Sequence, residues 1–266
     1  MINAALYKKE MKNSWKMLVI FGAILTMYIS MIIGMFDPEM ADILKEFEKT
    51  MPELMAAVGM TGGTDTLIGF MSTYLYGMLL LVFPMVFSII KANGLVAKYV
   101  DGGSMAGLLA SPVKRTTVAF TQLSVLVTNI TLLLLYCTAL EWAVAEMTFP
   151  GTLKLAELLR LNGGLWLLQF LIGSFCFMSS CLFGDSKMSV TVGASVPVLM
   201  YVIQMLANMG GKLENFKYAT VFTLFQPEKF VSGDGFAALS ALILFISAAA
   251  ISAAAVWIFK NKDLYI

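Results

Sequence analysis

The sequence predicts an all-α integral membrane protein that crosses the bilayer six times, with residues 1–266 forming a single transmembrane domain. Hydrophobic residues make up 59% of the chain and charged residues 13%, and the mean hydropathy is +0.82. Soluble domains average about 25% charged residues. Runs of about 20 apolar residues, the length that crosses a bilayer, occur near residues 17–36, 67–90, 116–145, 164–183, 188–209 and 237–259.

The segment before the first apolar run predicts an amphipathic, interfacial helix over residues 3–16. Tyr7, Met11 and Trp15 recur every fourth residue, which places them on one helix face. The lysines of the segment lie largely off this face, where they can meet anionic headgroups at the inner membrane surface. The apolar run that follows exceeds the 7 to 15 residues of a signal-peptide core, so we expect it to remain as a membrane helix.

A polar, glycine-rich stretch over residues 99–123 separates the second and third apolar runs. Asp101 or Ser104 can cap a short helix there, and Pro112 is expected to end it because proline disfavours the α conformation of the residue before it. The helix would carry three apolar residues on one face: Met105, Leu108 and Leu109. Two turns are not stable alone in water, so this face should pack on the membrane surface or another protein. An ordinary connecting loop is the alternative.

The distribution of basic residues predicts that both termini are cytoplasmic. One set of short segments holds 11 of the 18 basic residues: Lys8, Lys9, Lys12, Lys16, Lys91, Lys98, Lys114, Arg115, Lys187, Lys260 and Lys262. The other set holds 7 in longer segments: Lys45, Lys49, Lys154, Arg160, Lys212, Lys217 and Lys229. The first set therefore marks the cytoplasmic side.

Several classes of chemistry are disfavoured by the residues present. The chain has no histidine, which removes imidazole metal sites and histidine-assisted nucleophiles. Its three cysteines lie in apolar runs and are interpreted as packing residues. No P-loop pattern G-x-x-x-x-G-K-[ST] occurs, so we expect no ATPase site, no cofactor and no metal in this chain. Nucleic acid is not an expected partner.

Charged residues within the apolar runs are scarce, which argues against a proton-coupled secondary transporter. Glu141 is the exception that we weigh. It falls near the outer end of the third run beside Trp142, and tryptophan favours the interface. We interpret Glu141 as an interfacial carboxylate, with a proton relay as the alternative.

The polar stretch "DGGSMAGLLASPVKRTTVAFTQ" resembles the first intracellular loop of ABC-2 type permeases, the membrane subunits of bacterial ABC exporters with an ABCG-like fold. Asp101-Gly102 stands where a glutamate-bearing stretch is common in that family. The resemblance implies a cytoplasmic coupling helix that docks on a separate ABC ATPase subunit. It assigns this role to Gly103, Ser104, Met105, Leu108, Leu109, Ser111, Pro112 and Arg115.

The same resemblance implies the assembly and its location. Two permease copies, identical or closely related, would work with two ATPase subunits that hold ATP and Mg²⁺. The complex would sit in the bacterial plasma membrane. The segment 210–236 would be a re-entrant outer segment before the sixth span, although a folded extracellular cap is the alternative. Its apolar residues are Phe216, Tyr218, Phe222, Leu224, Phe225 and Phe230.

In the family, the second and fifth spans line the substrate path. The residues that this implies are Tyr74, Tyr76, Phe83, Thr191, Ser195 and Gln204, although core packing is the commoner role for any single residue of this kind. Their apolar and aromatic character favours an amphipathic substrate such as a peptide or an antibiotic. The expected function is thus that of the permease subunit of an ATP-driven exporter. A non-transporting membrane scaffold or immunity protein remains the alternative.

Overall fold

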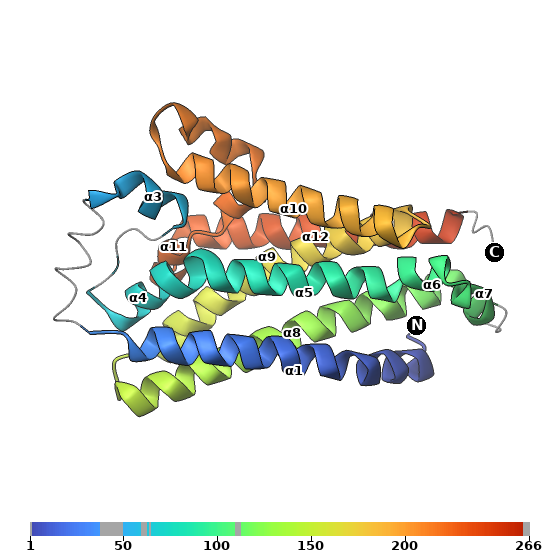
Figure 1. Ribbon diagram of the computed structural model, residues 1–266, viewed down its shortest axis with the longest axis horizontal. Helices are drawn as coiled ribbons and strands as arrows, with labels where there is room; N and C mark the ends of the chain where they lie inside the picture. Colours follow the sequence, from blue (N-terminus) through green and yellow to red (C-terminus); the bar gives the residue numbers. More distant parts are fainter. Residues whose placement is uncertain (1, 38–49, 60–62, 64, 110–112, 263–266) are drawn as a thin grey trace.

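The six predicted spans are present as long helices. The computed structural model describes residues 2–37, 50–59, 63, 65–109 and 113–262, and within them the chain is helical without strands. Six of its helical segments are long and apolar enough to cross a membrane. They run side by side along the long axis of the molecule (Figure 1).

The first three spans lie near the predicted positions. Span one is α1 (Ala4–Gly34), and span three is α8 (Arg115–Thr148). Span two is composite, because four short elements continue one another: α4 (Leu67–Tyr74), the π-helix η2 (Leu75–Leu79), α5 (Leu80–Leu95) and α6 (Ala97–Asp101). The short α3 (Pro52–Ala57) precedes span two, and α7 (Ser104–Leu109) follows it.

The last three spans are α9 (Leu155–Leu182), α10 (Ser186–Asn208) and α12 (Gly235–Asn261). Helix α9 begins nine residues before the apolar run that predicted it. Between α10 and α12 the chain forms two 3₁₀ helices and one short α-helix: η3 (Gly211–Ala219), η4 (Val221–Leu224) and α11 (Pro227–Ser232). The η3 and η4 pair folds back beside the end of α10, and α11 packs on α9 (Figure 1).

The expected interfacial helix over residues 3–16 is not a separate element. It is continuous with the first span in the 31 residues of α1, which give a length of about 46 Å at 1.5 Å per residue. Its first half is held by other helices, because Tyr7 donates a hydrogen bond to Thr128 Oγ1 at 2.9 Å and Thr121 Oγ1 accepts from Asn3 N at 2.9 Å. These contacts with α8 keep the segment in line with the span.

Span two is interrupted by Pro84, whose ring removes one backbone donor from α5. The side chain of Gln169 on α9 meets the carbonyls freed nearby, donating to Leu81 O at 2.9 Å and to Leu80 O at 3.4 Å. In a bilayer such carbonyls have no water to accept from. Gln169, itself fully buried, therefore stabilises the irregular part of span two.

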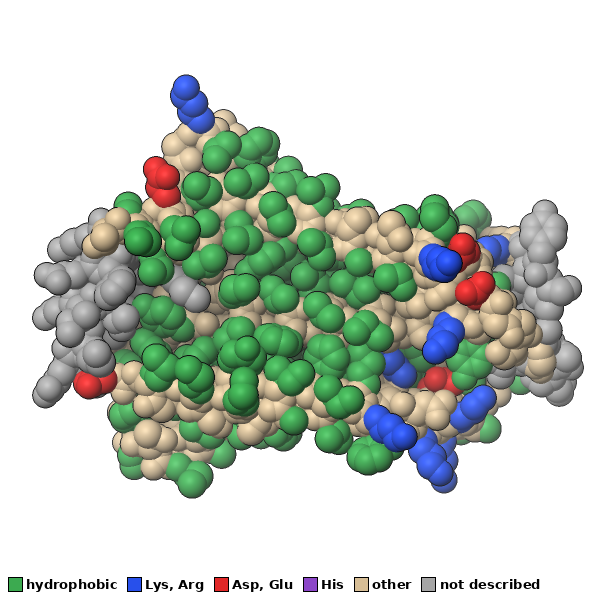
Figure 2. Space-filling model, in the orientation of Figure 1, with side chains coloured by type: hydrophobic (Ala, Val, Ile, Leu, Met, Phe, Trp, Pro, Cys, Tyr) green, Lys and Arg blue, Asp and Glu red, His purple; other side chains and the backbone are tan. Residues whose placement is uncertain are grey.

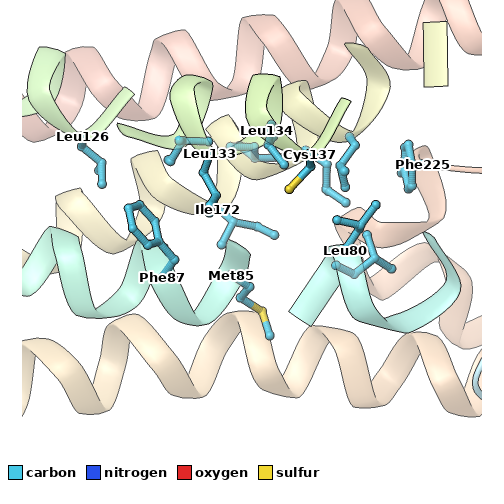
Figure 3. Close-up of a cluster of buried hydrophobic side chains, with 14 of the residues drawn as sticks. Leu80, Met85, Phe87, Leu126, Leu133, Leu134, Cys137, Ile172 and Phe225 are labelled. Atoms are coloured by element: carbon cyan, nitrogen blue, oxygen red, sulfur yellow. The ribbon is translucent and has the colours of Figure 1, made fainter. Parts of the chain in front are cut away.

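The core of the bundle lies where α5, α8 and α9 meet. Figure 3 shows Phe87 of α5, Leu133 and Cys137 of α8, and Ile172 of α9 in one cluster. All four side chains are buried, and the cysteine thiol is free. The interpretation of Cys137 as a packing residue agrees with this position.

The surface divides into an apolar band and charged ends. Hydrophobic side chains cover the middle of the face in Figure 2, and Lys and Arg side chains gather at the end where α7 lies. The described ends of the chain, at the start of α1 and the end of α12, lie at this same end (Figure 1). We call it the α7 end and the opposite one the α3 end.

Candidate functional site

The segment expected to be a coupling helix forms two short helices at the α7 end. Gly103 separates them with a φ of +69°, a conformation that glycine adopts without strain. Helix α7 then runs from Ser104 to Leu109. The side chains of Leu108 and Leu109 lie outside the described residues, as do Ser111 and Pro112 entirely.

Met105 does not have the exposed position expected for a docking residue. Its side chain is fully buried and belongs to the hydrophobic core of the chain. It therefore anchors α7 to the bundle. Gly107 lies two residues further on, about 200° around the helix at about 100° per residue, and is exposed. The side of α7 at Gly107 thus faces outward.

Arg115 at the start of α8 contacts the C-terminal segment. Its guanidinium donates to Lys262 O at 2.9 Å, and Lys262 Nζ donates to Cys181 O at 3.1 Å near the end of α9. Cations stabilise helix C-termini. Burial lowers the pKa of Lys262 below its ordinary value. Arg115 and Lys262 together therefore link the start of α8 with the ends of α9 and α12.

A cavity at the α3 end brings together two of the predicted path residues. It has a volume of about 260 Å³ and lies between η2, α10, η4 and α11. Tyr76 and Gln204 line it, with aromatic and polar neighbours that include Tyr201, Asn208, Phe222, Phe225 and Gln226. We call it the polar-aromatic cavity.

Hydrogen bonds fix the wall of this cavity. Gln204 accepts from Thr223 Oγ1 at 2.8 Å and donates to Asn208 Oδ1 at 2.8 Å. Tyr201 donates weakly to Gly77 O at 3.4 Å, and its ring packs against Phe222 with centroids 5.4 Å apart. A pocket with aromatic walls and a few oriented amides suits an amphipathic molecule.

Gly77 in the π-helix lets the preceding loop approach the cavity closely. A Cβ at this position would lie 3.1 Å from the carbonyl oxygens of Val58 and Gly59, closer than ordinary packing allows. The loop after α3 therefore closes over η2, and Ala57 and Gly59 complete the lining. Single-turn π-helices are frequent at functional sites.

Behind the cavity lies a buried polar cluster that joins three spans. Tyr76 of η2 donates to Glu141 Oε2 at 2.7 Å, and the Asn162 amide lies 2.9 Å from Glu141 Oε2 and 2.6 Å from Tyr76 Oη. Tyr76 and Glu141 are fully buried and Asn162 is 6% exposed. Tyr76 therefore belongs to both features, because its side chain separates the cavity from the carboxylate.

The other predicted path residues do not lie in the cavity. Tyr74 packs on Phe70 at a ring distance of 4.6 Å, and Phe83 packs on Tyr28 at 5.5 Å. Thr191 and Ser195 are exposed on α10 nearer the α7 end. The structure brings together only Tyr76 and Gln204 of the six.

For two residues of the polar cluster, Glu141 and Asn162, the structure differs from the sequence-based expectation. Glu141 was expected as an interfacial carboxylate, but it is fully buried and hydrogen-bonded inside the bundle. Asn162 precedes the fourth apolar run, so the apolar pattern does not point to it. The sequence does hold one indication of this cluster: a carboxylate within a membrane span, such as Glu141, needs polar partners from neighbouring helices.

No model of a protein family, no curated protein and no solved structure matches the chain.

Proposed function

We propose that this chain is the permease subunit of an ATP-driven exporter and that the polar-aromatic cavity binds an amphipathic compound on its way across the membrane. The observation that carries the proposal is the cavity itself. It is formed by span two, α10 and the returning segment η4 and α11. Its aromatic walls with amide groups match a molecule that has both apolar and polar parts.

An exporter also needs a site where an ATP-hydrolysing subunit docks, and we propose the α7 end for it. Helix α7 protrudes from the end of the bundle (Figure 1), anchored by the buried Met105 and open at Gly107. The resemblance of this segment to the coupling helix of ABC-2 type permeases supports docking of an ATPase subunit there. ATP and Mg²⁺ would then bind to that subunit, and a second permease copy would complete the translocator.

The function is tested by purifying the chain in mild detergent from its own membranes and measuring ATP hydrolysis with a panel of amphipathic peptides and antibiotics. We expect a nucleotide-hydrolysing subunit to accompany the chain, with some compounds stimulating turnover. Gln204→Ala should shift the half-stimulating concentration of those compounds by about tenfold, since single contacts of bound ligands are often worth this much.

Ser195→Ala is the matched control, because Ser195 lies on the same helix but outside the cavity and is exposed. In the Ser195→Ala variant, the half-stimulating concentration of each compound should equal that of the parent. A preparation that lacks any ATP-hydrolysing protein would contradict the exporter assignment. Equal responses of the Gln204 and Ser195 variants would contradict the assignment of the cavity as the binding site.

The orientation is tested with an impermeant thiol reagent on intact cells. The background is a variant in which Cys137, Cys176 and Cys181 are replaced. We expect Glu214→Cys to be labelled and Ser104→Cys to be protected, since the basic α7 end should be cytoplasmic. Both residues are exposed, so burial cannot account for a difference. Labelling of position 104 alone would reverse the orientation.

A further inference from the structure

The α7 end contains a second, larger cavity that the proposed transport path does not use. It has a volume of about 950 Å³ and lies between the first half of α1, the end of α5, α6 and the start of α7. Three lysines line it, together with two asparagines and a serine: Lys9, Lys91, Lys98, Asn13, Asn93 and Ser104. We call it the lysine cavity.

Lys91 is the unusual residue of this cavity. It is only 8% exposed, and burial of a lysine is costly unless its charge is compensated. Among the described residues its ammonium group has no hydrogen bond and no ion pair within 4 Å, although it lies within the electrostatic reach of Glu10. The Lys91 ammonium group therefore opens into the cavity, where an anion could pair with it.

Two carboxylates, those of Glu10 and Asp101, also line the lysine cavity. Glu10 accepts a hydrogen bond from the Tyr99 hydroxyl and offsets part of the positive charge of the lysines. Asp101 lies at the exposed rim. Three lysines against two carboxylates leave a net positive charge in the cavity. Figure 2 shows Lys and Arg side chains gathered at this end of the molecule.

We propose that the lysine cavity binds an anionic phosphate group, and that its source is the headgroup of a phospholipid in the adjacent leaflet. Phosphate oxygens accept strong charge-assisted hydrogen bonds from lysine. The lipid source is favoured by the apolar side of the cavity, which Met17 and Ile90 line. Ile90 is 52% exposed and Val86, one turn deeper on α5, is 36% exposed, which provides a track for an acyl chain.

A bound headgroup would touch the elements that position α7. Gly102 and Ser104, which flank the turn into α7, both line the lysine cavity. Its occupant would therefore connect α1, α5 and the start of α7 through one charged group. Anionic lipid in the leaflet at the α7 end would stabilise this arrangement, whatever the chain transports.

The test measures binding of phosphatidylglycerol and of phosphatidylcholine to the purified, delipidated full chain by native mass spectrometry. We expect phosphatidylglycerol to bind more tightly, because only its headgroup carries a net negative charge. Lys91→Met should weaken that binding about tenfold, equivalent to about 1.4 kcal/mol. Lys12→Met is the matched control, since Lys12 is an exposed lysine of α1 outside the cavity, and it should leave binding unchanged.

Gly94→Leu is a second variant that keeps all three lysines and blocks the cavity. Gly94 lines the cavity, and a Cβ there would meet no described atom within 4 Å, so the side chain enters open space. It should also weaken phosphatidylglycerol binding, with a melting temperature near that of the parent. If Lys91→Met fails to fold, this variant still tests whether phosphatidylglycerol binds in the lysine cavity.

Soluble glycerol phosphate distinguishes the two sources of the phosphate group. If glycerol phosphate binds in a manner that requires Lys91 and phosphatidylglycerol does not, the site serves a soluble phosphate compound and the lipid source is wrong. If neither ligand responds to Lys91→Met or to Gly94→Leu, the phosphate site is overturned. If Lys12→Met has the same effect as Lys91→Met, the attraction is a general surface charge, which also overturns it.

Discussion

Glu141→Ala is expected to lower the stability of the purified chain by about 1–3 kcal/mol, the usual cost of leaving buried donors unpaired. Glu141 Oε2 is the acceptor shared by the Tyr76 hydroxyl and the Asn162 amide. Both donors come from other spans and are buried, so no water replaces the lost carboxylate. The change in melting temperature in detergent measures the effect.

Two further variants separate hydrogen bonding from loss of volume. Glu141→Gln keeps one acceptor oxygen for both donors, and its amide nitrogen replaces Oε1, which has no partner among the described residues. It should destabilise the chain less than Glu141→Ala does, because both hydrogen bonds to Oε2 are kept. Glu146→Ala removes an exposed carboxylate of the same helix and should leave the melting temperature almost unchanged.

A double-mutant cycle shows whether the cluster acts as a unit. Asn162→Ala alone should also destabilise the chain, but the combined Glu141 and Asn162 variant should lose less than the sum, because the two residues share one hydrogen bond. Strict additivity, or equal melting temperatures for Glu141→Ala and Glu146→Ala, would contradict the cluster as a stabilising contact between spans two, three and four.

The sequence located the spans well but not their ends. Each apolar run reports which residues suit lipid, and six such runs identify six membrane helices. A helix continues beyond its run when polar residues near its end find partners. Helix α9 extends beyond its apolar run through Asn162, which is paired inside the bundle. Helix α1 begins at Ala4, where Asn3 caps it and its first half packs on α8.

The candidate sites depended on contacts that no local pattern contains. Gln204 and Tyr76 were predicted for the path, but the cavity that joins them exists because η3 and η4 fold back on α10. Met105 was predicted to face a partner from its helical spacing with Leu108 and Leu109. Spacing identifies the residues that share a face but not the element that covers it, and the bundle itself covers Met105.

If an ATP-hydrolysing subunit docks on α7 as proposed, Gly107→Trp should remove it from the purified chain while leaving the helical bundle intact. Gly107 lies on the exposed side of α7, and a Cβ there would meet no described atom within 4 Å. The indole therefore adds bulk outside the fold. If a partner packs on this side of α7, the ring occupies its position, because close-packed interfaces have no room for a side chain of that size.

Two glycine variants are the controls for this result. Gly107→Ala should retain the subunit, since a methyl group is small and alanine favours the helix by about 1 kcal/mol over glycine. Gly34→Trp places the same ring in open space at the far end of α1 and should also retain it. The measurements are the amount of copurified subunit, its ATP turnover and the melting temperature.

The three readouts separate docking from folding. Loss of the subunit with an unchanged melting temperature is the expected outcome, because α7 stays anchored through Met105 on its opposite side. A lower melting temperature would mean that the ring disturbs the bundle, and Gly107→Asp, which adds a charge with little bulk, would then be measured in its place. Full retention of the subunit by both variants, with compound-stimulated turnover, would show that α7 is a connecting element and would contradict the proposed docking on it.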